Sequence, residues 1–203
     1  MDRASGAEVL VRRQKWQFYE IQDLIFMNRT ETIWAFSLAL AFFAGWIDWR
    51  TRRIPNWLTV PSLFIGVLLH SWMTGWRGAL FAVEGASLAL VLLLPPVLMR
   101  ALGAGDWKLM AALGAFVGPW MLLFVLVASV FVAGLMAIVL MIQRKRVKST
   151  LRNLVVLVQG FFSFGLRGNP DITLDNPALL KLPFGVAAAT GTLICFLVAR
   201  WGL

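Results

Sequence analysis

The stretch WKLMAALGAFVGPWMLLFVLVASVFVAGLMAIVLMI, from Trp107 to Ile142, decides the fold of this chain. Its only charged residue is Lys108. The run is much longer than the ~20 apolar residues that one helix needs to cross a bilayer. It must therefore fold back once. Gly118-Pro119 is the natural break, because glycine permits unusual dihedral angles and proline interrupts helical hydrogen bonding. We expect a short span before this break and a longer span after it.

The composition of the whole chain agrees with a membrane protein. Of 203 residues, 60% are hydrophobic and only 14% are charged, and the mean hydropathy is +0.77. A soluble domain of this size would rarely tolerate these values. Four more spans are predicted, at residues 32–47, 56–73, 78–99 and 182–201. The sequence therefore predicts an all-α membrane protein with about six transmembrane helices, forming a single domain over residues 32–201.

Two segments do not fit the pattern of membrane spans. Residues 1–31 hold five basic and five acidic side chains. They form either a short amphipathic helix at the membrane surface or a segment upstream of a natural start at Met27. We expect no signal peptide, because this tail lacks a short apolar core followed by a cleavage site. Residues 143–181 begin with basic residues and later read GNPDITLDNP, which predicts a cytoplasmic or interfacial loop.

The formal net charge is +9, which in a soluble protein could indicate nucleic-acid binding. Here the basic residues gather in the gaps between spans, where orientation signals explain them and no nucleic-acid partner is needed. The gaps on one side of the six-span arrangement contain Arg50, Arg52, Arg53, Arg100, Lys108, Arg144, Lys145, Arg146, Lys148, Arg152, Arg167 and Lys181. The opposite side has only Arg77 and Arg200. The positive-inside rule places the basic side in the cytoplasm, although the five basic residues of the tail would then lie outside.

Three carboxylates lie in or at the end of apolar segments, namely Asp48, Glu84 and Asp106. A carboxylate next to hydrocarbon is costly, so it usually has a partner or a function. Asp48 and Asp106 are both expected at the cytoplasmic boundary, where they could meet. Glu84 lies within a span and is expected to be a buried carboxylate that is neutral or hydrogen-bonded. His70 is expected at the outer membrane interface.

Two aspartates held close together at a low-dielectric boundary would share one proton. The ionised member could then deprotonate a water that attacks a peptide carbonyl, while the protonated member hydrogen-bonds the carbonyl oxygen. No metal and no cofactor are required. Gly103 and Gly105 would let a substrate strand approach Asp106, which should stand at the start of the next helix. Lys108 could anchor this segment or bias the pair electrostatically.

At this point the sequence resembles the type IV prepilin peptidases, which are aspartic proteases of the GxGD class. The resemblance rests on Asp48 followed by Arg53-Ile54-Pro55-Asn56 and Leu58-Thr59, on Gly103-Ala104-Gly105-Asp106 with Lys108-Leu109, and on Pro183-Phe184-Gly185 at the last span. It covers about residues 32–201.

The resemblance implies that Asp48 and Asp106 are the catalytic pair. Gly103, Gly105, Lys108, Arg53, Pro55 and Asn56 are then supporting or substrate-binding residues. It further implies a multi-pass protein of a bacterial or archaeal cytoplasmic membrane, with a cytosol-facing site that cleaves the leader from a prepilin or pilin-like precursor. The expected scissile bond lies at the junction between this leader and the hydrophobic helix of the precursor.

This chain differs from the longer family members, which carry CxxC motifs and also methylate the new amino terminus. Its one cysteine, Cys195, allows neither a CxxC motif nor an internal disulfide. The chain is more similar to the short form associated with Flp-type tight-adherence pili, or to archaellin-type processing enzymes. The sequence does not indicate an oligomeric state.

Other classes of protein are also compatible with buried carboxylates. One is a small transporter that uses Asp48, Glu84 and Asp106 as a proton or cation path. Another is a non-enzymatic scaffold of a pilus or secretion assembly. A transporter should place its acidic groups at mid-membrane depth, whereas the two aspartates are expected at one edge. Presenilin-like proteases share the GxGD motif, but their first aspartate lies deep in a span beside tyrosine.

Overall fold

The computed structural model describes residues 30–143 and 182–201, and all regular secondary structure in these ranges is helical. Five helices are long and apolar enough to cross a membrane. They are the helix Thr30–Thr51, α2 (Asn56–Thr74), α3 (Trp76–Leu98), α4 (Ala104–Gln143) and α6 (Phe184–Trp201). The fold class predicted from the sequence is confirmed. Most of the predicted amino-terminal tail and nearly all of the predicted loop at 143–181 lie outside the described residues.

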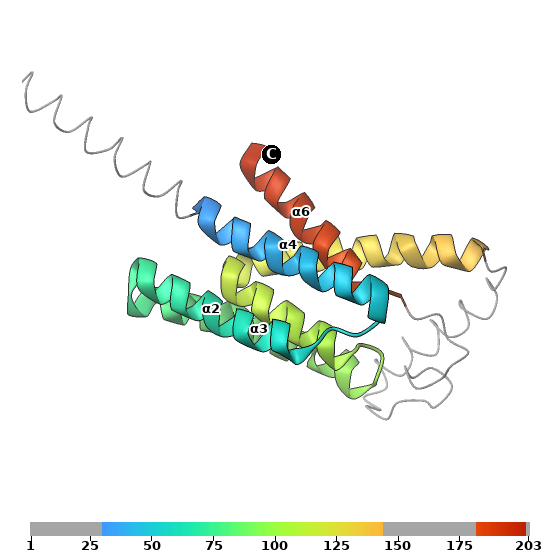
Figure 1. Ribbon diagram of the computed structural model, residues 1–203, viewed down its shortest axis with the longest axis horizontal. Helices are drawn as coiled ribbons and strands as arrows, with labels where there is room; N and C mark the ends of the chain where they lie inside the picture. Colours follow the sequence, from blue (N-terminus) through green and yellow to red (C-terminus); the bar gives the residue numbers. More distant parts are fainter. Residues whose placement is uncertain (1–29, 144–181, 202–203) are drawn as a thin grey trace, which may run out of the picture.

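The long helix α4 contains both the fourth and the fifth predicted spans. Its backbone is non-helical at Gly118, with φ 78° and ψ 176°, directly before Pro119. A Cβ atom on Gly114 would lie 3.0 Å from Cδ2 of Leu122. Residues eight apart in a continuous helix are separated by ~12 Å along its axis, so this contact requires the chain to fold back. Figure 1 shows the reversal between the green and yellow parts of α4. The predicted break is therefore confirmed.

The first half of α4 forms the centre of the bundle. Every residue from Leu109 to Gly118 is buried, and α4 packs against α2, α3 and α6. A helix that is apolar on all sides is expected in such a position. Small residues let the neighbouring helices approach it closely. A Cβ atom on Gly85 of α3 would overlap the Gly114 carbonyl oxygen, and one on Gly66 of α2 would lie 3.0 Å from the Ala115 Cβ.

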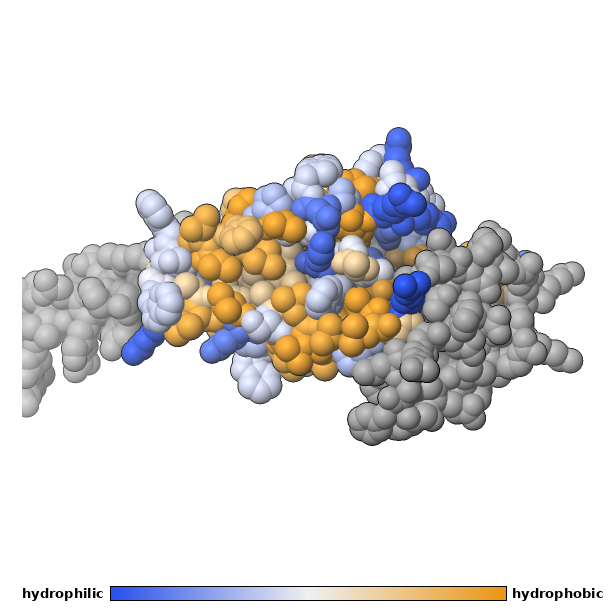
Figure 2. Space-filling model, turned by 90° about the horizontal axis from the view of Figure 1, so that it is seen from below, coloured by the Kyte–Doolittle hydropathy of each residue, from blue (hydrophilic) through white to orange (hydrophobic). Residues whose placement is uncertain are grey.

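The outer surface carries the features of a lipid-facing protein. Apolar side chains cover much of the described surface, and a large group of hydrophilic residues lies toward one end of the molecule (Figure 2). Exposed tryptophans occur at both ends of the helices, as in the aromatic belts of membrane proteins. One group contains Trp72, Trp76, Trp120 and Trp201, and the other contains Trp46, Trp49 and Trp57.

Candidate active site

Asp48 is placed by the buried stripe of the first helix. The inward-facing residues Trp34, Ser37, Ala41 and Ala44 recur every three or four positions, and Asp48 is next in this series. Its side chain is only 5% exposed. The sequence suggested that the polar stretch beginning at Asp48 ends the span, but the helix continues for almost one more turn to Thr51. Asp48 therefore lies inside the helix and faces the other helices.

The amino-terminal turn of α6 supplies a hydrogen-bond donor to Asp48. The backbone N–H of Gly185 donates to Oδ2 of Asp48 over 2.8 Å. This contact depends on the absence of a side chain, because a Cβ atom on Gly185 would lie 2.8 Å from the Asp48 Cβ. The helix dipole of α6 adds a favourable interaction with an ionised Asp48. The charge of Arg52 also acts on this carboxylate.

Asp106 lies in the first turn of α4, as predicted. Its carboxylate reaches back and accepts a hydrogen bond from the backbone of Gly103, the residue that precedes the helix. This is one half of the interaction known as a capping box. A Cβ atom on Gly103 would lie 2.9 Å from Oδ2 of Asp106, so glycine leaves room for the bent-back side chain. Asp106 is partly exposed, whereas Asp48 is buried.

The two aspartates come together at one end of the bundle. The turn between the first helix and α2 and the turn between α3 and α4 lie at the same end (Figure 1). The carboxyl groups are close enough for the charge of Asp48 to act on Asp106. Two carboxyl groups that interact through their charges can share a proton. One of them can then accept a proton while the other donates one.

The predicted supporting residues connect the segment that precedes α2 with the start of α4. A Cβ atom on Gly105 would lie 3.0 Å from the carbonyl oxygen of Ile54, so the segment before α2 rests directly on the start of α4. Lys108 Nζ donates to Oδ1 of Asn56 over 2.9 Å. Pro55 is the extended residue before α2, with φ −76° and ψ 146°. Arg53 has an exposed side chain in the same connection.

Glu84 is not part of this site. The sequence predicted a buried carboxylate, and this is wrong, because Glu84 lies on the exposed face of α3. The reason is its neighbour Gly85, which occupies the face that packs on α4. A proton or cation path through all three carboxylates therefore receives no support. Among residues 30–143 and 182–201, no three His, Cys, Asp or Glu side chains gather as metal ligands.

His70 also differs from its prediction. It is 7% exposed and its Nε2 lies 2.7 Å from the carbonyl oxygen of Phe116. The ring also lies against Phe81, with 5.3 Å between the ring centroids. A carbonyl oxygen only accepts, so Nε2 carries the hydrogen and donates. His70 is thus a buried contact of the α4 break and not an interfacial side chain.

A family model described as the type IV leader peptidase family matches residues 35–138. This is about half of the chain and includes both Asp48 and Asp106. The protein belongs to the type IV leader peptidase family. Comparison with curated proteins and with solved structures gave no match.

In this member of the type IV leader peptidase family, Gly185 is the site residue that sequence reasoning missed. Gly185 was noted as part of Pro183-Phe184-Gly185 but was assigned no contact. It lies outside the segment that the family model matches. The hydrogen bond to Asp48 comes from a backbone N–H, and every residue except proline has one. The glycine itself was the available signal, because it permits close approach of two helices.

Proposed function

We propose that this protein is an aspartic endopeptidase that removes the leader from type IV prepilin-like precursors, of the Flp type, at the cytoplasmic face of the membrane. The meeting of Asp48 and Asp106 at one end of the bundle carries the proposal. Membership of the leader peptidase family supports the substrate class. The excess of basic residues in the connections on this side supports the cytoplasmic orientation.

In the proposed mechanism, the ionised aspartate accepts a proton from water as the water oxygen bonds to the scissile carbonyl carbon. The protonated aspartate hydrogen-bonds the carbonyl oxygen and stabilises the negative charge that develops there. When the tetrahedral intermediate breaks its carbon–nitrogen bond, the departing amine takes a proton from the aspartates. Gly185 and Gly103 hold the two carboxylates through backbone hydrogen bonds.

The experiment compares Asp48→Asn and Asp106→Asn with the wild-type protein. Each enzyme is co-expressed with candidate small pilin precursors, and loss of the leader is followed by mass spectrometry. Removing either proton-transferring group should lower the cleavage rate by at least about 100-fold. Glu84→Gln is the matched control, because Glu84 is the carboxylate on the exposed face of α3. This variant should cleave at the wild-type rate.

Cleavage by either Asp→Asn variant at more than a tenth of the wild-type rate would refute the proposed catalytic pair. Both variants should remain folded and inserted, because asparagine is nearly isosteric with aspartate. Recovery from membranes and elution as a single species in detergent would establish this.

A further inference from the structure

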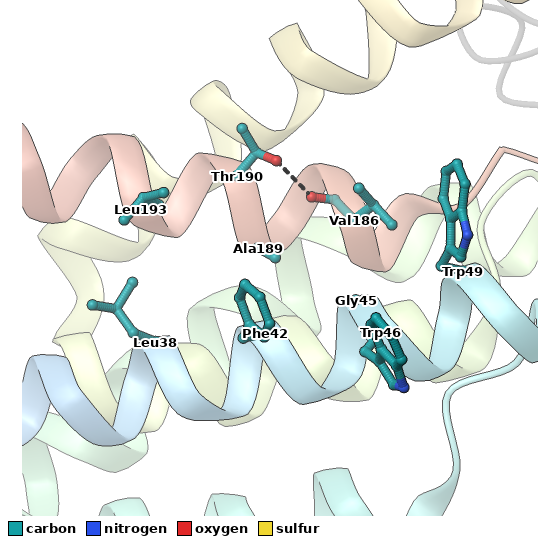
Figure 3. A pocket seen from close by; sticks show the side chains of 9 residues that line it. All are labelled: Leu38, Phe42, Gly45, Trp46, Trp49, Val186, Ala189, Thr190 and Leu193. Carbon is teal, nitrogen blue, oxygen red and sulfur yellow. Dashed lines mark hydrogen bonds between the residues drawn. The ribbon is translucent and has the colours of Figure 1, made fainter.

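An apolar groove runs between the first helix and α6. Its walls are formed by Leu38, Phe42, Gly45, Trp46 and Trp49 of the first helix and by Val186, Ala189, Thr190 and Leu193 of α6. The groove is open along one side and has a volume of about 470 Å³. Figure 3 shows these side chains on two facing helices, with Trp49 at one end and Leu38 and Leu193 toward the other.

The groove offers almost nothing polar to an occupant. Thr190 is the one lining residue with a hydroxyl group, and that hydroxyl donates to the carbonyl oxygen of Val186 in its own helix (Figure 3). The floor is formed by small residues, since a Cβ atom on Gly45 would lie 3.2 Å from the Ala189 Cβ. Larger side chains such as Phe42 and Trp46 stand beside it and are exposed. This shape suits the side chains of an apolar helix lying alongside.

One wall of the groove is already held in place. The guanidinium group of Arg50 lies over the ring of Trp46, with 4.7 Å to the ring centroid. A cation in this position attracts the ring face and restrains the indole. Trp46 therefore needs little rearrangement to receive a partner, which lowers the cost of binding.

One end of the groove lies at the same level along the first helix as Asp48, although Asp48 itself is not among the lining residues. Trp46 and Trp49 flank Asp48 in the sequence, and Val186 follows Gly185, whose N–H binds Asp48. From Trp49 to Leu38 the lining residues extend over ~16 Å of helix, at 1.5 Å per residue. This covers about half of a typical hydrocarbon core. A helix in the groove would thus begin beside Asp48 and continue into the bilayer.

We infer that this groove binds the apolar transmembrane helix of the precursor and so presents the bond before that helix to Asp48 and Asp106. The inference rests on the proposed function, because a leader peptidase must receive a substrate whose hydrophobic helix directly follows the scissile bond. The end of the groove at the level of Asp48 favours this occupant over a lipid chain or a second copy of the protein, since neither needs to end beside the carboxylates.

The first test fills the groove with Thr190→Trp, because Thr190 is exposed and its replacement need not displace the helix floor. Two substrates are compared: a full pilin precursor that the wild-type enzyme cleaves, and a peptide of the same precursor that stops a few residues after the scissile bond. We expect kcat/KM for the full precursor to fall about tenfold and that for the short peptide to stay unchanged. Val91→Trp, on the exposed face of α3, should change neither value.

Equal effects of Thr190→Trp on both substrates, or no effect on either, would overturn the inference. Failure of the wild-type enzyme to cleave any full precursor would instead count against the proposed function itself. The two failures are therefore distinguishable.

A second test locates the bound helix directly. A photo-crosslinking amino acid replaces Phe42 in the groove or, as the control, Phe64 on the exposed face of α2, in an Asp106→Asn background that retains the uncleaved precursor. We expect crosslinks to the precursor from position 42 and not from position 64. The inference is wrong if position 42 crosslinks only to lipid or to a second copy of the enzyme, or if position 64 captures the precursor equally well.

Discussion

The position of the Asp48 side chain depends on the absence of a Cβ atom at Gly185. Its N–H donates to Asp48, and the space that a side chain would need is already occupied by the Asp48 Cβ. A substituted residue here must push two helices apart at the point where the carboxylate is held. Gly103 has a comparable place beside Asp106. In both cases the residue without a side chain determines where a carboxylate points.

We therefore expect Gly185→Ala to lower kcat about 100-fold, because small displacements of a catalytic group have effects of that size. KM should change less than kcat, since Gly185 contacts Asp48 directly, whereas it affects the groove only through the spacing of its two helices. Cleavage of a pilin precursor by purified enzyme measures both quantities. Gly134→Ala is the matched control, because a Cβ atom there meets nothing within 4 Å. A Gly185→Ala enzyme with the wild-type kcat would show that this hydrogen bond is dispensable.

At the scale of helices, the break in α4 needs support from a neighbouring element. Gly118 interrupts the helix, so carbonyl groups in the preceding turn lose their intrahelical donors while they are buried among the other helices. His70 of α2 supplies a hydrogen bond to one of them, at Phe116. Gly118 itself has a positive φ and lies against the Phe81 ring, where a side chain would overlap it. The folded-back shape of α4 therefore depends on residues from α2 and α3.

Replacing His70 with alanine should reduce the free energy of unfolding by about 1–3 kcal/mol, the usual cost of leaving a buried polar group unsatisfied. His70→Gln should recover part of this loss, because its amide can donate to the Phe116 carbonyl. Thermal unfolding in detergent, followed by circular dichroism, measures the difference. Leu68→Ala, at an exposed position of the same helix, serves as the control. Equal stability of His70→Ala and wild type would mean that the carbonyl finds another donor.

The elements were more predictable from the sequence than the contacts between them. The membrane-length helices and the Gly118-Pro119 break follow from local hydrophobicity and backbone chemistry, and both are confirmed, although the first helix continues past its predicted end to Thr51. Lys108 and Asn56 were each singled out, but their hydrogen bond depends on how α2 packs on α4. The positions of Glu84 and His70 were wrong for the same reason. Burial in a helix bundle is set by which face meets a neighbour, and a nearly uniform apolar sequence does not mark that face.

At the scale of the whole molecule, three distant parts of the chain build one end of the bundle. The end of the first helix contributes Asp48, the start of α4 contributes Asp106, and the start of α6 contributes Gly185. The folding back of α4 makes this possible, because it returns the chain to the side where α6 begins (Figure 1). An uninterrupted α4 would instead carry the chain away from the end of the bundle where Asp48 lies.

The proposed orientation predicts which end of the bundle can be labelled from outside the cell. Ala104 is exposed at the start of α4 beside the candidate site, and Thr74 is exposed at the far end of α2. In a Cys195→Ser background, Thr74→Cys should react with a membrane-impermeant maleimide added to intact cells. Ala104→Cys should react only after the membrane is permeabilised, because the orientation we propose from the basic connections places its end in the cytoplasm. Labelling is measured by the mass shift of the purified protein.

Each outcome of this labelling has a distinct meaning for the proposed function. The reverse pattern would place Asp48 and Asp106 on the outer side, away from newly made precursors, and would contradict cleavage at the cytoplasmic face. Labelling of both cysteines in intact cells would contradict a bilayer between the two ends, since a helix of the length of α2 should separate them by most of its thickness. Cleavage of the same pilin precursor by both cysteine variants would show that each reports on an active enzyme.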